Sequence, residues 1–214
     1  YITNNQEFMG LNFFVNENVL IPQPDTEIIV EETLKKCKEL LQKNAQIKIL
    51  DLGTGSGAIA VSLENFLGDK AEVFASDTST KALEVAKNNN EKNNTNVRFI
   101  ESNLFENIQE QKFNIIASNP PYIRSNVINN LPKQVQNEPH LALDGGEDGL
   151  KFYKKIIEQA CNYIENGYLI LEIGYDQKED VENLLKENKN YSEIKTIQDF
   201  SGNDRCVIAK VGKI

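Results

Sequence analysis

The chain has few of the residues that usually carry metal, disulfide or acid–base chemistry. Its 214 residues include three cysteines, one histidine and no tryptophan. Cys37, Cys161 and Cys206 lie far apart, are odd in number and lack metal-ligand spacing, so we expect reduced thiols and no metal site. With His140 as the single histidine, a histidine-rich metal site is excluded and triad chemistry is disfavoured.

Long apolar runs and basic clusters are also missing. No stretch approaches the roughly 20 apolar residues that cross a bilayer, and no charged-then-apolar leader opens the chain, so we expect a cytoplasmic protein that does not contact membranes. The net charge is −9 without a concentrated basic run. Proteins that grip DNA through phosphates usually present a basic face, so direct nucleic-acid binding is not expected.

The first part of the chain predicts a β-hairpin followed by a helix. Residues 7–21 hold two apolar stretches around the polar residues 16–18, which we interpret as the hairpin turn. Asp25 is a plausible N-cap. After it, apolar residues recur every three or four positions, which is typical of a helix. We therefore expect a hairpin and linker segment over 1–24, ahead of a main domain over 25–214.

From residue 47 onward, strand and helix patterns alternate. Strands are predicted over 47–53, 71–77, 97–102, 113–119 and 167–174, with two more within 191–211. Helices are predicted over 58–67, 80–93, 149–164 and 178–188. This alternation indicates an α/β fold with a doubly wound, mostly parallel seven-stranded sheet. The last two strands have no helix between them and should form an antiparallel edge hairpin.

A glycine-rich loop follows the first strand of this sheet. Gly53, Gly55 and Gly57 permit a tight turn and close approach of a ligand to the N-terminus of the next helix. With Ala58 the stretch also satisfies G-x-G-x-x-A, so a nicotinamide-dinucleotide site is one alternative. A tight turn without a ligand is another.

Two acids help to separate these alternatives. Asp51 ends the strand before the glycines, where a carboxylate opposes a pyrophosphate but suits a ligand with an ammonium group and a sulfonium. Asp77 ends the next strand, where a carboxylate can accept hydrogen bonds from ribose hydroxyls. The acids and glycines together resemble the cofactor half of class I S-adenosylmethionine-dependent methyltransferases.

The segment Asn119-Pro120-Pro121-Tyr122 leaves the fourth strand of the sheet. The Asn119 carbonyl oxygen can accept one N–H of a planar NH2 group, and the backbone carbonyl of Pro120 can accept the other. Two such acceptors orient the nitrogen toward a methyl donor without a strong base. The prolines stiffen the loop, and Tyr122 can pack on the flat target. A proline-rich turn without catalytic function is the alternative.

The whole pattern resembles the glutamine methyltransferases that modify peptide-chain release factors (the HemK/PrmC family). The resemblance is carried, in order, by "QEFMGLNFFVNENVLIPQPDTE", "DLGTGSGAIA", "SNPPYI", "NEPHLALDGGEDGLKFY" and "SGNDRCV". It implies methyl transfer from S-adenosyl-L-methionine, with S-adenosyl-L-homocysteine as product. The acceptor would be the glutamine side-chain amide in the Gly-Gly-Gln motif of class 1 release factors.

The resemblance also assigns residues to the site. The cofactor would contact Asp51, Gly53, Thr54, Gly55, Ser56, Gly57, Asp77, Asn103, Leu104 and Asn119. The stretch Ser102-Asn103-Leu104 would pass the adenine. Asn119, Pro120, Pro121 and Tyr122 would hold the glutamine, with Asn119, Pro120 and Tyr122 as the catalytic set. Phe8, Pro22 and Glu138-Pro139 would help to shape the site.

Three departures from the family pattern are visible. Gln23 stands where the family commonly has arginine, and Asn103 where it commonly has aspartate. Members also usually carry a small helical domain ahead of the hairpin, which helps to dock the release factor and which we expect to be absent from this chain.

Three rival functions remain open. An adenine-modifying nucleic-acid methyltransferase shares the Asn-Pro-Pro-Tyr motif but needs a basic surface or target-recognition domain. A dinucleotide oxidoreductase is disfavoured by Asp51 and by the lack of a catalytic His or Tyr–Lys pair. A cofactor-binding module without activity is disfavoured by the intact motif.

Overall fold

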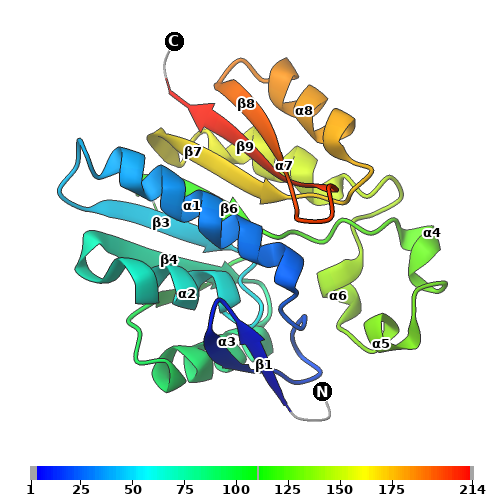
Figure 1. Cartoon of the computed structure of the whole chain (residues 1–214). Coiled ribbons are helices and arrows are strands. Elements are labelled where there is room, and N and C mark those ends of the chain that lie inside the picture. The colour runs from blue at the N-terminus through cyan, green and yellow to red at the C-terminus, as the bar shows by residue number, and fades with distance from the viewer. Residues whose placement is uncertain (1–3, 110, 213–214) are drawn as a thin grey trace.

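A computed structural model describes residues 4–109 and 111–212 and shows an α/β fold with helices on both faces of a central sheet (Figure 1). The sheet has seven strands in the order β5-β4-β3-β6-β7-β9-β8. Neighbouring strands from β5 to β7 pair in parallel, whereas β9 is antiparallel to both β7 and β8. The doubly wound sheet and its antiparallel hairpin are therefore confirmed, with β8 as the edge strand.

The elements alternate along the chain much as expected. The strands are β1 (Asn5–Phe8), β2 (Leu11–Phe14), β3 (Ile47–Leu52), β4 (Ala71–Asp77), β5 (Arg98–Glu101), β6 (Phe113–Ser118), β7 (Ile164–Glu172), β8 (Tyr191–Gln198) and β9 (Asp204–Val211). The longer helices are α1 (Glu27–Leu40), α2 (Ala58–Leu67), α3 (Thr80–Lys92), α7 (Lys151–Ala160) and α8 (Lys178–Glu187). The short helices are η1 (Pro24–Thr26), η2 (Gly68–Lys70), α4 (Ser125–Ile128), α5 (Lys133–Gln136) and α6 (His140–Leu143).

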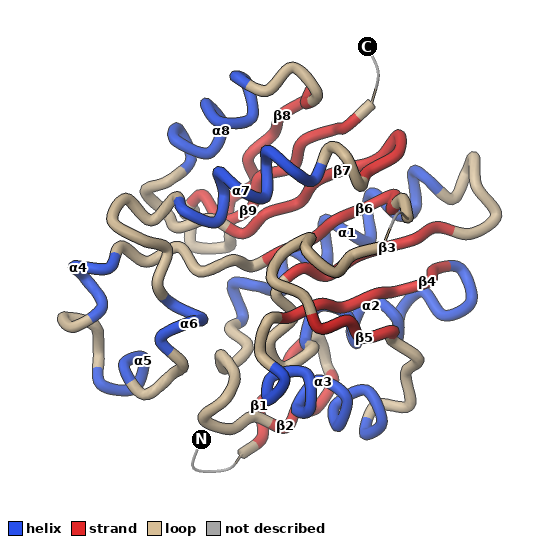
Figure 2. The backbone as a smooth tube through the Cα atoms, turned by 180° about the vertical axis from the view of Figure 1, so that it is seen from behind, coloured by secondary structure: helices blue, strands red, loops and turns tan. Residues whose placement is uncertain are grey.

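Two apolar layers hold the helices against the sheet. Helices α1 and α2 cover one face and bury a core with the central strands and the hairpin residues Phe8 and Phe13. Helices α7 and α8 cover the other face, which is nearer the viewer in Figure 2. Burial of this apolar surface on both faces explains why the central strands are rich in Ile, Leu, Val, Ala and Phe.

The N-terminal hairpin is present, but its predicted turn is wrong. Strands β1 and β2 pair with Phe8 opposite Leu11, so the turn is Met9-Gly10 and not residues 16–18. Met9 and Gly10 have φ values of 52° and 74°, as a two-residue turn of the primed type requires. The polar residues 16–18 belong instead to the linker that runs from the hairpin to η1.

Asp25 does not cap the first long helix as predicted. A short 3-10 turn over Pro24–Thr26 precedes α1, and Thr26 occupies the cap position without a side-chain capping bond. The Asp25 carboxylate instead lies 3.2 Å from the Arg205 guanidinium of β9. This ion pair joins η1, directly ahead of α1, to strand β9 of the sheet.

The boundary between α7 and β7 also differs from the expectation. The helix ends at Ala160 and the strand begins at Ile164, ahead of Gly167. The strand was expected to start at Gly167, but this glycine lies inside β7, at a point where β6 passes too close to allow a side chain. A Cβ atom there would lie 1.7 Å from the backbone oxygen of Asn114.

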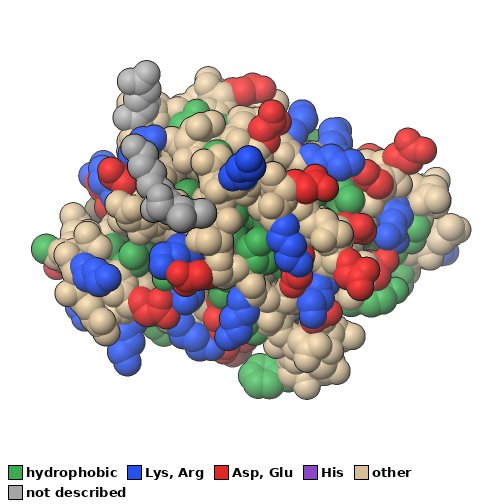
Figure 3. All heavy atoms as spheres, turned by 90° about the horizontal axis from the view of Figure 1, so that it is seen from above, with side chains coloured by type: hydrophobic (Ala, Val, Ile, Leu, Met, Phe, Trp, Pro, Cys, Tyr) green, Lys and Arg blue, Asp and Glu red, His purple; other side chains and the backbone are tan. Residues whose placement is uncertain are grey.

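Charged side chains of both signs are mixed on the face seen in Figure 3, without a large basic patch.

None of the helices in the described part of the chain is long and apolar enough to span a bilayer.

Candidate functional site

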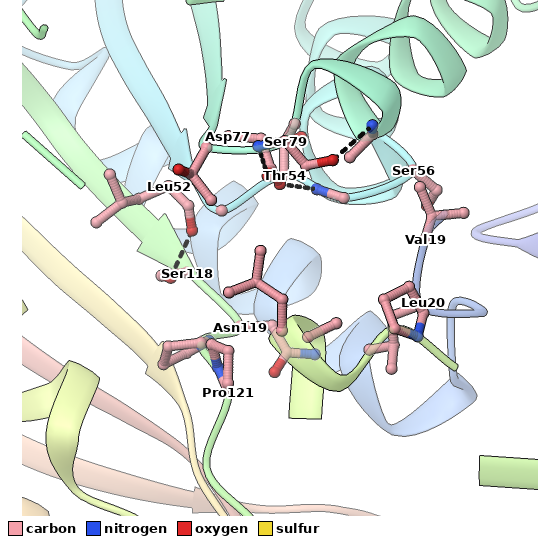
Figure 4. A pocket seen from close by; sticks show the side chains of 18 of the residues that line it. Val19, Leu20, Leu52, Thr54, Ser56, Asp77, Ser79, Ser118, Asn119 and Pro121 are labelled. Carbon is pink, nitrogen blue, oxygen red and sulfur yellow. Dashed lines mark hydrogen bonds between the residues drawn. The ribbon is translucent and has the colours of Figure 1, made fainter. Parts of the chain in front are cut away.

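A cavity opens at the carboxyl ends of β3, β4 and β6. The strand order reverses here, because β4 and β5 follow on one side of β3 and β6 and β7 on the other. Ligands of doubly wound sheets bind at this kind of position. Figure 4 shows Asp77 and Ser79 on one side of the cavity, Asn119 and Pro121 on the opposite side, and Val19 and Leu20 on a third. The cavity is lined by Asn18, Val19, Leu20, Pro22, Thr26, Leu52, Gly53, Thr54, Gly55, Ser56, Ala58, Ile59, Asp77, Thr78, Ser79, Ala82, Ser102, Asn103, Leu104, Ser118, Asn119, Pro120, Pro121, Pro139, Leu141, Ala142, Phe152 and Ile156.

The glycine loop forms the floor of this cavity. Gly53 and Gly55 have φ values of 78° and 54°, and a Cβ at either position would meet no atom within 4 Å. The open space above them is the space that a closely approaching ligand needs. The backbone N–H groups of Gly53 and Thr54 both donate to the carbonyl of Ser76 at 2.8 Å, which fixes the loop against β4.

Asp77 lies beside this loop at the end of β4. Its carboxylate accepts hydrogen bonds from the backbone N–H groups of Gly55 and Ser79, each at 2.9 Å. Burial raises the pKa of Asp77, and these backbone bonds oppose the shift. A carboxylate can accept about four hydrogen bonds, so Asp77 keeps capacity for hydroxyl groups of a ligand.

Asp51 lies behind the loop and is not among the residues that line the cavity in the described part of the chain. Its Oδ2 accepts from the Thr54 hydroxyl at 2.6 Å and from the Ala60 N–H at 3.2 Å. Burial raises the pKa of Asp51 to about 7. Asp51 therefore stabilises the loop by hydrogen bonds from the side away from the cavity. Its contact with a cofactor stays a prediction.

Asn119 reaches the cavity from the end of β6, together with Pro120 and Pro121. Its Nδ2 donates to the Thr26 hydroxyl at 3.2 Å, which leaves the carbonyl oxygen Oδ1 as an acceptor. The preceding residue, Ser118, donates to the Leu52 carbonyl at 2.6 Å and joins the ends of β6 and β3. The Asn-Pro-Pro segment and the glycine loop are thus held on facing sides of one cavity.

Tyr122 follows a different course from its three neighbours. It packs on the core between the sheet and α7, and it is not among the residues that line the cavity. Its hydroxyl donates to Glu172 Oε1 at 3.3 Å, and burial raises its pKa. A contact between Tyr122 and a substrate stays a prediction.

Asn103 and Leu104 line the cavity as the resemblance implies. Asn103 Nδ2 donates to Glu106 at 2.7 Å, so its carbonyl oxygen remains available as an acceptor. Leu104 has φ 51°, and its carbonyl accepts from the Ser102 hydroxyl at 2.8 Å. Asn103 can therefore offer a hydrogen-bond acceptor where the family commonly has aspartate.

The remaining predicted residues are divided between the cavity and the core. Pro22 and Pro139 line the cavity, whereas Phe8 packs edge-on against Phe13 in the core at 6.0 Å between ring centroids. Glu138 is buried, and burial raises its pKa to about 6. Gln23 is exposed, and its side chain donates to the carbonyl of Ile21 in the same linker.

Sequence reasoning missed several residues of the cavity. Thr26 and the linker residues Val19 and Leu20 line one side, and the α6 residues Leu141 and Ala142 line another. The linker and α6 enclose the cavity only through tertiary folding, and no spacing in the sequence indicates that.

Glu172, a buried acid that sequence reasoning also missed, could have been identified from its position in the sequence. It is a lone acid at the end of an apolar strand, as Asp51 is.

Comparison with known proteins identifies the family. The Methyltransferase small domain matches residues 34–200. A release factor glutamine methyltransferase of Clostridium acetobutylicum is 44% identical over 99% of this chain and 74% of its own length. A second, of Flavobacterium psychrophilum, is 46% identical over 97% of this chain and 73% of its own length. A third, of Fusobacterium nucleatum, is 43% identical over 98% of this chain, which spans 59% of that relative.

Solved structures show the same fold at lower identity. A methyltransferase from Pyrococcus furiosus superposes with a TM-score of 0.70 at 23% identity, covering 95% of this chain and 90% of its own. A 16S rRNA methyltransferase from Thermus thermophilus, solved with AdoMet and guanosine, gives 0.64 at 17% identity, covering 97% of this chain and 49% of its own. At these identities the match establishes the fold.

Proposed function

The chain belongs to the release factor glutamine methyltransferases, and we propose that it methylates the side-chain amide of the glutamine in the Gly-Gly-Gln motif of a class 1 release factor. The proposal goes beyond the family match in assigning the substrate to this chain and the roles to its residues. The observation that carries it is the placement of Asn119 across one cavity from the glycine loop.

The residues that line the cavity offer hydrogen-bond acceptors that suit S-adenosylmethionine. The open space above Gly53 and Gly55 admits a ligand against the backbone. The Asp77 carboxylate can accept ribose hydroxyls, and the Asn103 carbonyl oxygen can accept an adenine amino group. When bound, this cofactor supplies an electrophilic methyl group on a sulfonium.

The residues on the opposite side suit a planar amide. The carbonyl oxygen of Asn119 accepts one N–H of the substrate NH2. The backbone carbonyl of Pro120, the next residue in the chain, accepts the other. The amide nitrogen is a weak nucleophile because its lone pair is delocalised. Two acceptors hold it in one plane and raise its electron density, so positioning and electrostatics replace a strong base.

Protein glutamine is a better candidate than adenine in nucleic acid. A planar NH2 is common to both, so the Asn-Pro-Pro-Tyr segment alone does not choose. The net charge of −9 and the mixed charges in Figure 3 oppose binding of a phosphate backbone. The relatives named for release factors match nearly the full chain.

A methyl-labelling assay with three separate substrates tests the proposal. The chain is incubated with methyl-labelled S-adenosylmethionine and either a release factor, the same factor with Gln→Ala in its Gly-Gly-Gln motif, or duplex DNA. We expect label only on the unaltered release factor. Label on DNA alone, or equal label on the two forms of the factor, contradicts the proposal.

A further inference from the structure

Three polar residues from separate parts of the chain, Asn119, Thr26 and Glu172, lie close together at one side of the cavity. Asn119 follows β6, Thr26 ends η1 and Glu172 ends β7. Thr26 is 5% exposed and Glu172 is 3% exposed, so neither relies on water for its hydrogen bonds. Asn119 Nδ2 donates to Thr26 Oγ1 at 3.2 Å.

Thr26 has one hydroxyl proton, and its direction decides which way the Asn119 amide faces. A hydroxyl can donate one hydrogen bond and accept two. If the Thr26 proton points away from Asn119, the hydroxyl oxygen accepts from Nδ2, and the Asn119 carbonyl is free for a substrate. If the proton points toward Asn119, the amide turns over and presents NH2 to the substrate, which repels another NH2.

Glu172 supplies the acceptor for that proton. Its Oε1 accepts from Tyr122 at 3.3 Å, whereas Oε2 is buried and has no close donor of its own among the described residues. Burial raises the pKa of Glu172 to about 7, and hydrogen bonding from the Thr26 hydroxyl lowers it in opposition, so Thr26 is the side chain placed to supply the missing donor. Buried acceptors strongly favour any donor within reach, because an unpaired acceptor is costly.

We propose that Thr26 and Glu172 are positioning residues that orient the Asn119 amide, so that its carbonyl oxygen faces the substrate NH2. The Thr26 hydroxyl donates its proton to the buried Glu172 carboxylate, and its oxygen then accepts a hydrogen bond from Asn119 Nδ2. This inference rests on the proposed function and deepens it, since it explains how one of two nearly isosteric amide orientations is selected.

Substitutions at Thr26 separate this role from simple packing. Thr26→Val keeps the shape but removes the hydroxyl, and we expect kcat to fall about 10-fold, roughly the worth of one hydrogen bond. Thr26→Ser keeps the hydroxyl and should restore kcat to within about 3-fold of the wild type. The affinity for S-adenosylmethionine should stay within about 3-fold in both variants, because Thr26 acts through Asn119.

Thr33→Val is the matched control. Thr33 is fully buried in α1, and its hydroxyl has no hydrogen-bond partner among the described residues. The same change in side chain there should leave kcat unchanged, so an equal loss in both valine variants contradicts the proposal.

A double-mutant cycle gives the sharpest test. In the Asn119→Ala background, Thr26→Val should lower kcat no further, because Thr26 has lost the group it orients. An equal fold-loss in both backgrounds, or a normal kcat for Thr26→Val alone, overturns the proposal. If the valine variant does not fold, Thr26→Ala takes its place in the cycle. A wild-type enzyme that leaves the release factor unmethylated contradicts the proposed function itself, and the orienting role with it.

Discussion

The glycines of the loop after β3 serve two separate purposes at the residue scale. Gly53 and Gly55 have open space where a side chain would stand, which leaves room for a ligand. Gly57 faces α3, and a Cβ atom there would lie 3.1 Å from the Cβ of Ala86. The first two glycines therefore leave open space over the loop, and the third allows α2 and α3 to pack closely.

Gly57→Ala should destabilise the protein more than an alanine at another left-handed glycine. Gly202 has nearly the same φ, 83° against 84°, but no atom within 4 Å of its Cβ position. We expect Gly202→Ala to cost about 1 kcal/mol of unfolding free energy from the left-handed backbone alone. Gly57→Ala should cost clearly more because α3 must also shift. Equal losses in chemical denaturation would show that the contact with Ala86 is relaxed without cost.

Asn119→Ala should separate chemistry from cofactor binding. We expect turnover to fall by at least about 10²-fold, since an acceptor aimed at the reacting nitrogen is lost. The dissociation constant for S-adenosylmethionine, measured by calorimetry, should change little. Asn190→Ala removes an exposed asparagine ahead of β8 and is the control. A near-normal rate for Asn119→Ala would remove Asn119 from its assigned role.

At this scale, the sequence predicts residues of the cavity where a short motif carries them. Gly53 to Ser56, Asp77, Asn103 and the Asn-Pro-Pro segment line one cavity, as expected from strand ends that share one edge of a sheet, whereas Gly57 is not part of the lining. Thr26 and Leu141 were missed because tertiary contacts alone place them there. Tyr122 lies outside the cavity lining and donates to Glu172, which is 50 residues away in the chain, so its position depends on a tertiary contact.

At the element scale, the N-terminal hairpin is attached to the glycine loop through one side chain. Asn89 of α3 exchanges two hydrogen bonds with the backbone of Phe14 in β2, at 2.6 and 2.9 Å. Its Nδ2 also donates to the carbonyl of Ser56 at 2.9 Å. Asn89 is fully buried, so these bonds link the hairpin, α3 and the loop without competition from water.

Asn89→Ala should therefore weaken both folding and cofactor binding. The change leaves the Phe14 N–H and carbonyl without this partner, and we expect a loss of about 2 kcal/mol or more in unfolding free energy. S-adenosylmethionine should bind several-fold more weakly because Ser56 is no longer held. Asn88→Ala, at the exposed neighbouring position of α3, is the control. Unchanged cofactor affinity in Asn89→Ala would mean that the hairpin does not support the loop.

Helices and strands could be predicted where apolar residues recur with the regular period of one element. The central strands and the long helices agree with the sequence to within a few residues. The hairpin turn was misplaced because Met9-Gly10 carries a weaker turn signal than the polar residues 16–18. The short helices α4, α5 and α6 were missed because four residues are too few to show a helical period.

On the scale of the whole molecule, buried carboxyl groups make stability depend on pH. Burial raises the pKa of Asp51 from 3.8 to about 7. The folded state therefore holds a proton that the unfolded state releases at lower pH. Stability from this group is fully present below about pH 4 and is lost as the pH rises through about 7.

Asp51→Asn should remove the part of this dependence that comes from Asp51. The unfolding free energy of the variant, relative to the wild type, should rise between pH 5 and about pH 8, because only the wild type must ionise a buried acid. Denaturant titrations at several pH values measure the difference, with Glu91→Gln on the exposed side of α3 as the surface control. A difference that stays flat across this range would place the Asp51 pKa near its ordinary value.

Methylation of the release-factor glutamine by this chain is tested most directly by tandem mass spectrometry. The peptide that contains Gly-Gly-Gln is analysed after incubation of the release factor with the chain and S-adenosylmethionine. We predict one added methyl group on the side-chain amide of that glutamine, and none in the Asn119→Ala reaction stopped at the same early time. An unmodified glutamine, or a methyl group on another residue, would contradict the claim.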